Sequence, residues 1–134
     1  MALSEALQMQ YEEFETNVRK LDQLISQLEL WSDEYTINHK KEEVRLPEYI
    51  ELHLNLESFK EALESEMNLL SQEAQLTEEV AKAKAHIEER LKSYEETEEV
   101  IHDWIREMKN PYALIHNSSV LEKNKEYILS IINE

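Results

Sequence analysis

The sequence has 134 residues with no glycine and no cysteine, and Asp and Glu outnumber Lys and Arg by 30 to 14, which gives a formal net charge of −16. Without glycine the chain cannot form Gly-rich phosphate loops or many tight hairpins, which excludes dinucleotide-binding and P-loop folds, and without cysteine it cannot form disulfides, thiolate nucleophiles or cysteine-ligated metal sites. The charge argues against nucleic acid and anionic membrane surfaces as partners, because both are polyanions that select basic patches.

The first predicted helix covers residues 4–39. Apolar residues repeat every seven positions along it and form a stripe three heptad positions wide. The stripe holds Leu7, Tyr11, Phe14, Val18, Leu21, Leu24, Ile25, Leu28, Trp31 and Tyr35. This width is typical of a helix that packs against two neighbours in a bundle. Ser4 is the predicted N-cap, and the polar Asn17 within the stripe is interpreted as a register determinant or a partly exposed position.

The second predicted helix covers residues 47–74 and follows a charged segment, 38–43, that we predict to be a loop. Pro47 suits a first helical turn, where a backbone N–H is not needed. The apolar face consists of Tyr49, Leu52, Leu56, Phe59, Leu63, Leu70 and Ala74. Because no strong helix breaker follows, one unbroken helix over 47–109 is the alternative to a break near residue 75.

The third predicted helix covers residues 77–109, with Thr77 as its N-cap. Its seven-residue repeat consists of Val80, Ile87, Tyr94, Ile101 and Met108, with Trp104 and Leu91 beside them. Glu98 interrupts the apolar pattern in the middle. Pro111 ends the helix, because the residue before a proline is disfavoured in the α conformation.

These elements predict an all-α fold, arranged as an elongated antiparallel three-helix bundle over residues 1–110. Residues 111–134 are predicted to be a linker and a short fourth, C-terminal helix. That helix is expected to begin at Ser119, since Ser119 and Glu122 match a capping box. The aromatic residues on the stripes, including Trp31 and Phe59, are predicted to lie in the core.

The histidines give little evidence for a metal site. Glu99 and His102 form the one Glu-x-x-His pair, whereas a ferritin-like di-iron bundle uses two such pairs and two further glutamates. Both residues are expected at the surface, and His53 is expected to be a partly covered residue at the bundle edge. We therefore predict no catalytic, cofactor-binding or metal-binding residues and no cofactor, and a ferritin-like metal-binding bundle is the most remote alternative.

Acidic residues concentrate on the second predicted helix. Residues 46–80 hold nine acids and one base, a local charge of −8. The candidate protein-binding residues are Glu48, Glu51, Glu57, Glu61, Glu64 and Glu66. They are interpreted either as a solvated acidic face that keeps the protein soluble or as a docking surface for a basic partner protein.

Three segments resemble the spectrin-repeat family. The segment 24–31 (LISQLELW) is similar to the first helix of that family with its buried tryptophan, 46–63 (LPEYIELHL followed by FKEAL) is similar to the second, and 87–94 (IEERLKSY) is similar to the start of the third. The resemblance implies a left-handed three-helix bundle that acts as a spacer and docking surface in cytoskeletal or membrane-skeleton proteins such as dystrophin, plakins and nesprins. It also implies tandem repeats and no catalytic activity.

The expected function is therefore a non-enzymatic helical scaffold or protein-interaction module. The main alternative is a coiled-coil subunit or adaptor of a larger assembly, in which an unbroken helix over 47–109 forms an extended homodimer. The chain contains no run of about 18 apolar residues that could span a membrane, and its start, MALSE, does not resemble a secretory signal. We expect a cytoplasmic, cytoskeleton-associated location, with a nuclear or nuclear-envelope location as the alternative.

Overall fold

The computed structural model describes residues 4–37, 46–108 and 110–134, and within these ranges the protein is all-α, as predicted. The long helices are α1 (Glu5–Thr36), α2 (Leu46–Leu70) and α3 (Thr77–Arg106). A short 3-10 helix, η2 (Ala74–Leu76), precedes α3, and the C-terminal part contains α4 (Pro111–His116), α5 (Ser119–Lys123) and α6 (Lys125–Ile132). The predicted loop over 38–43 lies outside the described residues, whereas α1 ends at Thr36 and α3 at Arg106, each three residues before the predicted ends at 39 and 109.

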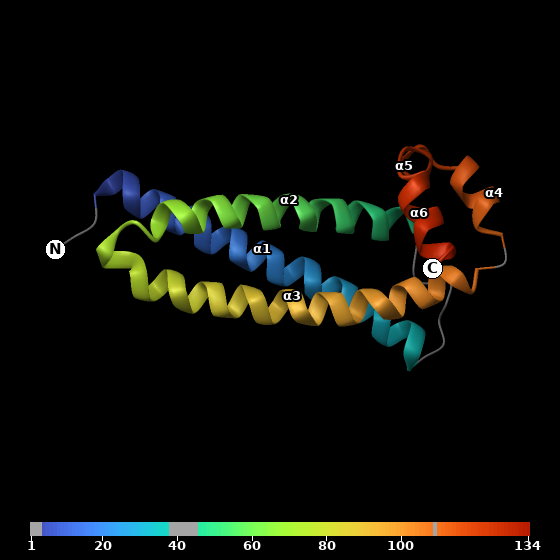
Figure 1. Cartoon of the computed structure of the whole chain (residues 1–134), viewed down its shortest axis with the longest axis horizontal. Coiled ribbons are helices and arrows are strands. Elements are labelled where there is room, and N and C mark those ends of the chain that lie inside the picture. Colours follow the sequence, from blue (N-terminus) through green and yellow to red (C-terminus); the bar gives the residue numbers. More distant parts are fainter. Residues whose placement is uncertain (1–3, 38–45, 109) are drawn as a thin grey trace.

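The three long helices lie lengthwise against one another, with α2 running opposite to α1 and α3 (Figure 1). The helix α1 packs closely on both α2 and α3, whereas α2 and α3 contact each other less. The helices α4–α6 gather at the end where α2 begins and α3 ends, where α5 packs on α2 and α6 packs on α3 (Figure 1). The molecule therefore has a turn end, at residues 71–76, and an opposite end covered by the short helices.

The core follows the seven-residue apolar repeats of the long helices. Phe14, Leu21 and Leu28 of α1 are at most 1% exposed and form part of one continuous hydrophobic cluster that extends to the short helices. Trp31 and Phe59, which the pattern placed in the core, are only partly buried and pack against the edge of the cluster.

The break between the second and third helices lies between Leu70 and Thr77, so the alternative unbroken helix over 47–109 does not form in this structure. The helix α2 ends four residues earlier than predicted. Ala74 is consequently exposed instead of lying on the apolar face. Thr77 is not the N-cap, because it already has helical dihedral angles and its Oγ1 donates to the Glu73 carbonyl at 3.2 Å.

The C-terminal part contains three short helices where one was predicted. At the start of α5, Ser118 has extended backbone angles, and its Oγ accepts a hydrogen bond from the Leu121 N–H at 3.4 Å. The predicted capping box at Ser119 is therefore wrong by one residue. The N-cap predicted at Ser4 is confirmed, since its Oγ accepts from the Leu7 N–H at 3.2 Å.

Candidate functional site

The acidic residues of α2 divide into two groups. Glu48, Glu51, Glu57, Glu61 and Glu64 are exposed. Residues 57, 61 and 64 are spaced by four and three residues and lie on one side of α2, whereas Glu51 and Glu48 lie further around its exposed surface; these five acids together are called the acidic face of α2.

Glu66, the sixth candidate, points towards α1. Its Oε1 accepts a hydrogen bond from Asn17 Nδ2 at 2.7 Å, and its Oε2 is buried without a hydrogen-bond partner. Burial raises the pKa of this carboxyl, and the Asn17 amide opposes that shift. Glu66 therefore belongs to the α1–α2 seam, where Asn17 makes the polar contact across the helices that its place in the stripe suggested.

Three of the five exposed acids of α2 have no cation partner among the described residues. Glu57 lies 3.7 Å from Lys60 Nζ. Within the described part of the chain, Glu51, Glu61 and Glu64 form no ion pair. This face consequently presents unpaired negative charge to solvent.

An elongated groove of about 320 Å³ lies between α2 and α3, near the turn end of the molecule. It exists because both helices lean on α1 and contact each other less closely. Its apolar lining consists of Leu63, Met67, Val80, Ile87 and Leu91, and its polar lining consists of Lys60, Glu64, Asn68, Ser71, Lys84 and Glu88.

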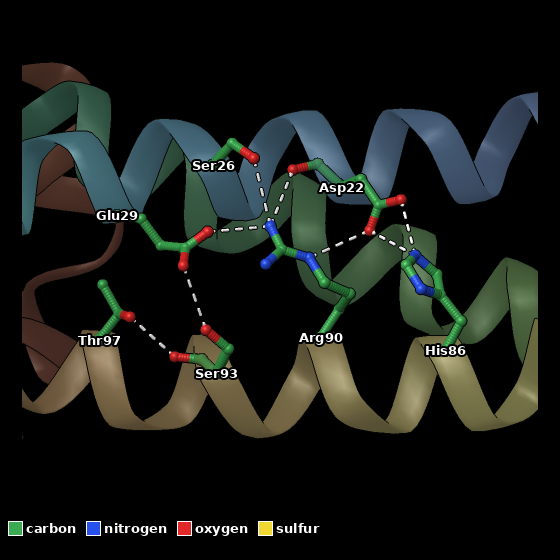
Figure 2. Close-up of polar contacts among 7 residues, drawn as sticks. All are labelled: Asp22, Ser26, Glu29, His86, Arg90, Ser93 and Thr97. Atoms are coloured by element: carbon green, nitrogen blue, oxygen red, sulfur yellow. Dashed lines mark hydrogen bonds and ion pairs between the residues drawn. The ribbon is translucent and has the colours of Figure 1, made fainter.

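A set of ion pairs and hydrogen bonds, the α1–α3 ion cluster, joins the first and third helices. Its members are Asp22, Ser26 and Glu29 of α1 and His86, Arg90 and Ser93 of α3 (Figure 2). Arg90 is central: its Nε donates to Asp22 Oδ1 at 3.2 Å and its Nη2 donates to Glu29 Oε1 at 2.9 Å. His86 Nε2 lies 2.8 Å from Asp22 Oδ2, and Ser93 donates to Glu29 at 3.3 Å. Because opposite charges meet at fixed positions, the cluster favours one register of α1 against α3.

A second and more buried set of polar side chains lies where α2, α3 and α6 meet. This junction network consists of Tyr49 and His53 of α2, Tyr94, Glu98 and His102 of α3, and Tyr127 of α6. Glu98 Oε2 accepts hydrogen bonds from the Tyr49 hydroxyl at 2.9 Å, from His53 Nδ1 at 3.0 Å and from the Tyr94 hydroxyl. Since a carboxylate only accepts, His53 must carry its proton on Nδ1.

The same network attaches α6 to the long helices. Tyr127 stacks on His53 with ring centroids 4.6 Å apart, and its hydroxyl lies 3.1 Å from that of Tyr49. His102 Nε2 lies 3.0 Å from the Tyr49 hydroxyl and 3.4 Å from that of Tyr127. The surface position predicted for His102 is therefore wrong, because α6 covers this side of α3. Glu99 is exposed, as predicted.

Burial and hydrogen bonding set the charges in the junction network. Burial alone raises the pKa of Glu98, but the hydrogen bonds from His53, Tyr94 and Tyr49 outweigh it and lower that pKa overall. Burial, with the nearby Glu98 charge, raises the pKa values of Tyr49 and Tyr94 far above their usual range. Burial also raises the pKa of Tyr127 to about 12 and lowers that of His102. Glu98 is thus an anion held by two tyrosine hydroxyl groups and the Nδ1–H of His53.

Sequence reasoning noticed Glu98 only as an interruption and did not group these residues. A signal was present, because Tyr49 and His53 are four residues apart, as are Tyr94, Glu98 and His102. Residues at this spacing share a helix face. Tyr127 gave no such signal, since its contacts depend on how α6 folds back.

The described residues include no group of three or more His, Asp or Glu side chains arranged to hold a metal ion. None of the described helices combines the length and apolar character needed to cross a membrane. No protein family, curated protein or solved structure gives a significant match to this chain. The likeness to spectrin repeats therefore rests on the sequence segments alone.

Proposed function

We propose that this chain is a non-catalytic helical scaffold and protein-interaction module, related in design to a spectrin repeat of a cytoskeletal or membrane-skeleton linker protein. The observation that carries the proposal is the exposed acidic face of α2, on which Glu51, Glu61 and Glu64 have no ion-pair partner among the described residues. Unpaired charge of one sign steers a partner of the opposite sign. The proposed partner surface is accordingly basic.

The arrangement of the long helices supports the scaffold part of the proposal. With 32, 25 and 30 residues, the helices span about 48, 38 and 45 Å at a rise of about 1.5 Å per residue. Long parallel and antiparallel rods around one narrow core suit a spacer, and they leave the outer faces available for binding. We propose that they form the elongated antiparallel three-helix bundle expected for a spectrin-like repeat, in a cytoplasmic protein.

The interior supports a non-catalytic function. Glu98 directs its Oε2 to three protein donors from α2 and α3, so this oxygen serves contacts between helices. Asp22 and Glu29 are likewise engaged by Arg90. The polar clusters thus serve contacts between helices.

The test is affinity capture with a charge-reversed α2 face, followed by mass spectrometry. One variant carries Glu51→Lys, Glu57→Lys and Glu61→Lys. The matched control carries Glu89→Lys, Glu95→Lys and Glu96→Lys, three exposed acids of α3, so both variants change the net charge equally. We expect a basic partner that wild type and control retain, that the α2 variant loses, and that added salt releases because screening weakens exposed charge pairs. Identical capture by all three proteins would contradict the acidic-face proposal.

The alternative of an extended coiled-coil dimer is tested on the same preparations. It was based on one helix over 47–109, whereas α2 ends at Leu70. Sedimentation velocity separates the two hypotheses, since the proposed module sediments as a monomer and the alternative as an elongated dimer.

A further inference from the structure

The groove between α2 and α3 combines an apolar floor with charged rims. Leu63, Val80 and Ile87 are at most 4% exposed, and Met67 and Leu91 are partly buried beside them. The volume of about 320 Å³ is at the lower end of the range of roughly 300–1,000 Å³ found for ligand sites. Such a volume suits a few apolar side chains from a partner, and the walls are two antiparallel helices.

The rim charges form a defined pattern. Lys60 and Glu64 on α2 are four residues apart, as are Lys84 and Glu88 on α3. Glu64 lies six residues before the end of α2 at Leu70, and Lys84 lies seven residues after the start of α3 at Thr77. Lys60 lies ten residues before Leu70, and Glu88 lies eleven residues after Thr77. Because the helices are antiparallel, Glu64 on the α2 rim lies across the groove from Lys84 on the α3 rim. About 6 Å further along the groove, Lys60 on the α2 rim lies across from Glu88 on the α3 rim, so the signs on the two rims are exchanged.

Three of the four rim charges have no partner among the described residues. Lys60 pairs with Glu57. Across the described ranges, Glu64, Lys84 and Glu88 form neither an ion pair nor a side-chain hydrogen bond. Three charges beside an apolar floor are therefore available to a docked molecule.

From this geometry we infer that the groove binds one amphipathic helix of a partner protein. The apolar stripe of that helix lies on Leu63, Met67 and Leu91, which converts this part of the molecule to four packed helices. On the flank facing α2 the partner has an acid opposite Lys60 and, one turn later, a base opposite Glu64. On the flank facing α3 it has a base opposite Glu88 and then an acid opposite Lys84.

A helix fits this groove better than other occupants. Amphipathic helices bind apolar grooves through side chains at helical spacing, and charges that flank an apolar seam select partner and orientation in coiled coils. Both the four-residue spacing and the alternation of sign match the repeat of a helix. A second copy of this chain is disfavoured, since each copy has a formal charge of −16.

The inference goes beyond the proposed function, because it names a second surface and a different partner chemistry. The acids that the acidic-face test reverses, Glu51, Glu57 and Glu61, do not line the groove, and Glu64, which belongs to both surfaces, stays unchanged in that test. Failure of one proposal therefore leaves the other measurable.

The experiment uses two synthetic amphipathic peptides of about 18 residues, long enough to form an isolated helix. Both have the same leucine stripe. The matched peptide has the flank charges given above, and the reversed peptide has each flank Lys and Glu exchanged. Fluorescence anisotropy measures their binding to the full chain at about 0.15 M salt, where distant charges are screened. We expect the matched peptide to bind about tenfold more tightly than the reversed one.

The decisive variant reverses all four rim charges through Lys60→Glu, Glu64→Lys, Lys84→Glu and Glu88→Lys, which leaves the net charge unchanged. It alters no core residue, and we expect the preference between the two peptides to invert. A floor variant, Met67→Lys, should weaken both peptides at least about tenfold while circular dichroism shows an unchanged helix content. A variant with Glu51→Lys and Glu61→Lys, which lie outside the groove lining and leave the Lys60–Glu57 ion pair in place, should retain the wild-type preference.

Three results would overturn the inference. The first is the absence of binding by either peptide to the wild-type chain. The second is equal binding of both peptides to the wild type and to the rim variant, which would leave only nonspecific apolar contact. The third is self-association of the chain that Met67→Lys abolishes, which would assign the groove to a second copy.

Discussion

The α1–α3 ion cluster and the junction network both cross helix seams, but they hold their charges differently. In the ion cluster, Arg90 is paired with two carboxylates, and the Arg90 and Asp22 side chains are 22% and 32% exposed. In the junction network the Glu98 and His53 side chains are both 17% exposed, and two of the three hydrogen-bond donors to Glu98 are neutral tyrosine hydroxyls. The first places charge against charge near water, and the second surrounds one half-buried carboxylate with two hydroxyl groups and an imidazole N–H.

This difference predicts where each cluster contributes stability. Exposed ion pairs contribute little, because water screens them and the long side chains lose entropy. A buried anion with several donors is costly to disturb, since removal of one partner leaves the others desolvated and unpaired. The junction network should therefore stabilise the attachment of the short helices, whereas the ion cluster mainly selects the register of α1.

The largest expected effect comes from Glu98→Ala. The change leaves the hydroxyls of Tyr49 and Tyr94 and the Nδ1–H of His53 without their common acceptor. We expect the free energy of unfolding to fall by about 3 kcal/mol, as measured by urea denaturation followed by circular dichroism. Glu99→Ala, at the exposed neighbouring position, should change it by less than about 0.5 kcal/mol. Equal effects of the two substitutions would remove the distinction between the clusters.

A smaller and local effect is expected from Tyr127→Ala. The substitution removes the stacking on His53 and the hydroxyl contacts to Tyr49 and His102. We expect a loss of about 2 kcal/mol that is concentrated in α6. Hydrogen exchange should show faster exchange of the α6 amides and unchanged exchange at the centre of α1. Faster exchange throughout the chain would show that α6 does not open separately.

The sequence predicted the helical class and the approximate limits of the long helices because the seven-residue apolar repeat indicates both that a segment is helical and how far the helix extends. Seven-residue spacing identifies a buried stripe whatever covers it, so Phe14, Leu21 and Leu28 could be assigned to the core. The helix ends were less accurate. At Thr77 and Ser119, side-chain type alone did not decide which residue is extended and which is already helical.

The candidate site was less predictable, because its residues meet only after the short helices fold back. His102 lies beside the apolar stripe of α3, and only the position of α6 determines that it is covered. Glu66 was counted with the exposed acids because composition records charge but not direction. The four-residue spacings of 49 and 53 and of 94, 98 and 102 were the local signs that a polar network replaces part of the seam.

Arg90→Met tests the small contribution to stability that we expect from the α1–α3 ion cluster. The change removes both carboxylate pairs of the ion cluster and keeps most of the aliphatic length of the side chain. Since the groups are partly exposed, we expect a loss of only about 1 kcal/mol. The loss should shrink when denaturation is repeated at about 1 M salt, because exposed pairs are screened. The effect of Glu98→Ala should persist at that salt concentration. A salt-insensitive loss above about 3 kcal/mol for Arg90→Met would place the ion cluster among the buried networks.

The smallest expected effect is a pH dependence from His102. Burial lowers the pKa of this imidazole from 6.5, so the folded chain binds the proton less readily than the unfolded chain. Its contribution is therefore fully retained well above pH 6.5 and is lost as the pH falls below that value. Glu98 stays ionised in this window because its pKa is lowered from 4.5. When the pH is lowered from about 7.5 to 5.5, the free energy of unfolding of the wild type should fall by more than that of His102→Gln. The difference between the two proteins should be less than about 1 kcal/mol. The remaining pH dependence, shared by both proteins, comes from the other titrating groups. His86→Gln, in the more exposed ion cluster, is the control variant. If His102→Gln leaves the pH dependence of stability unaltered, the junction network does not exclude the charged imidazole.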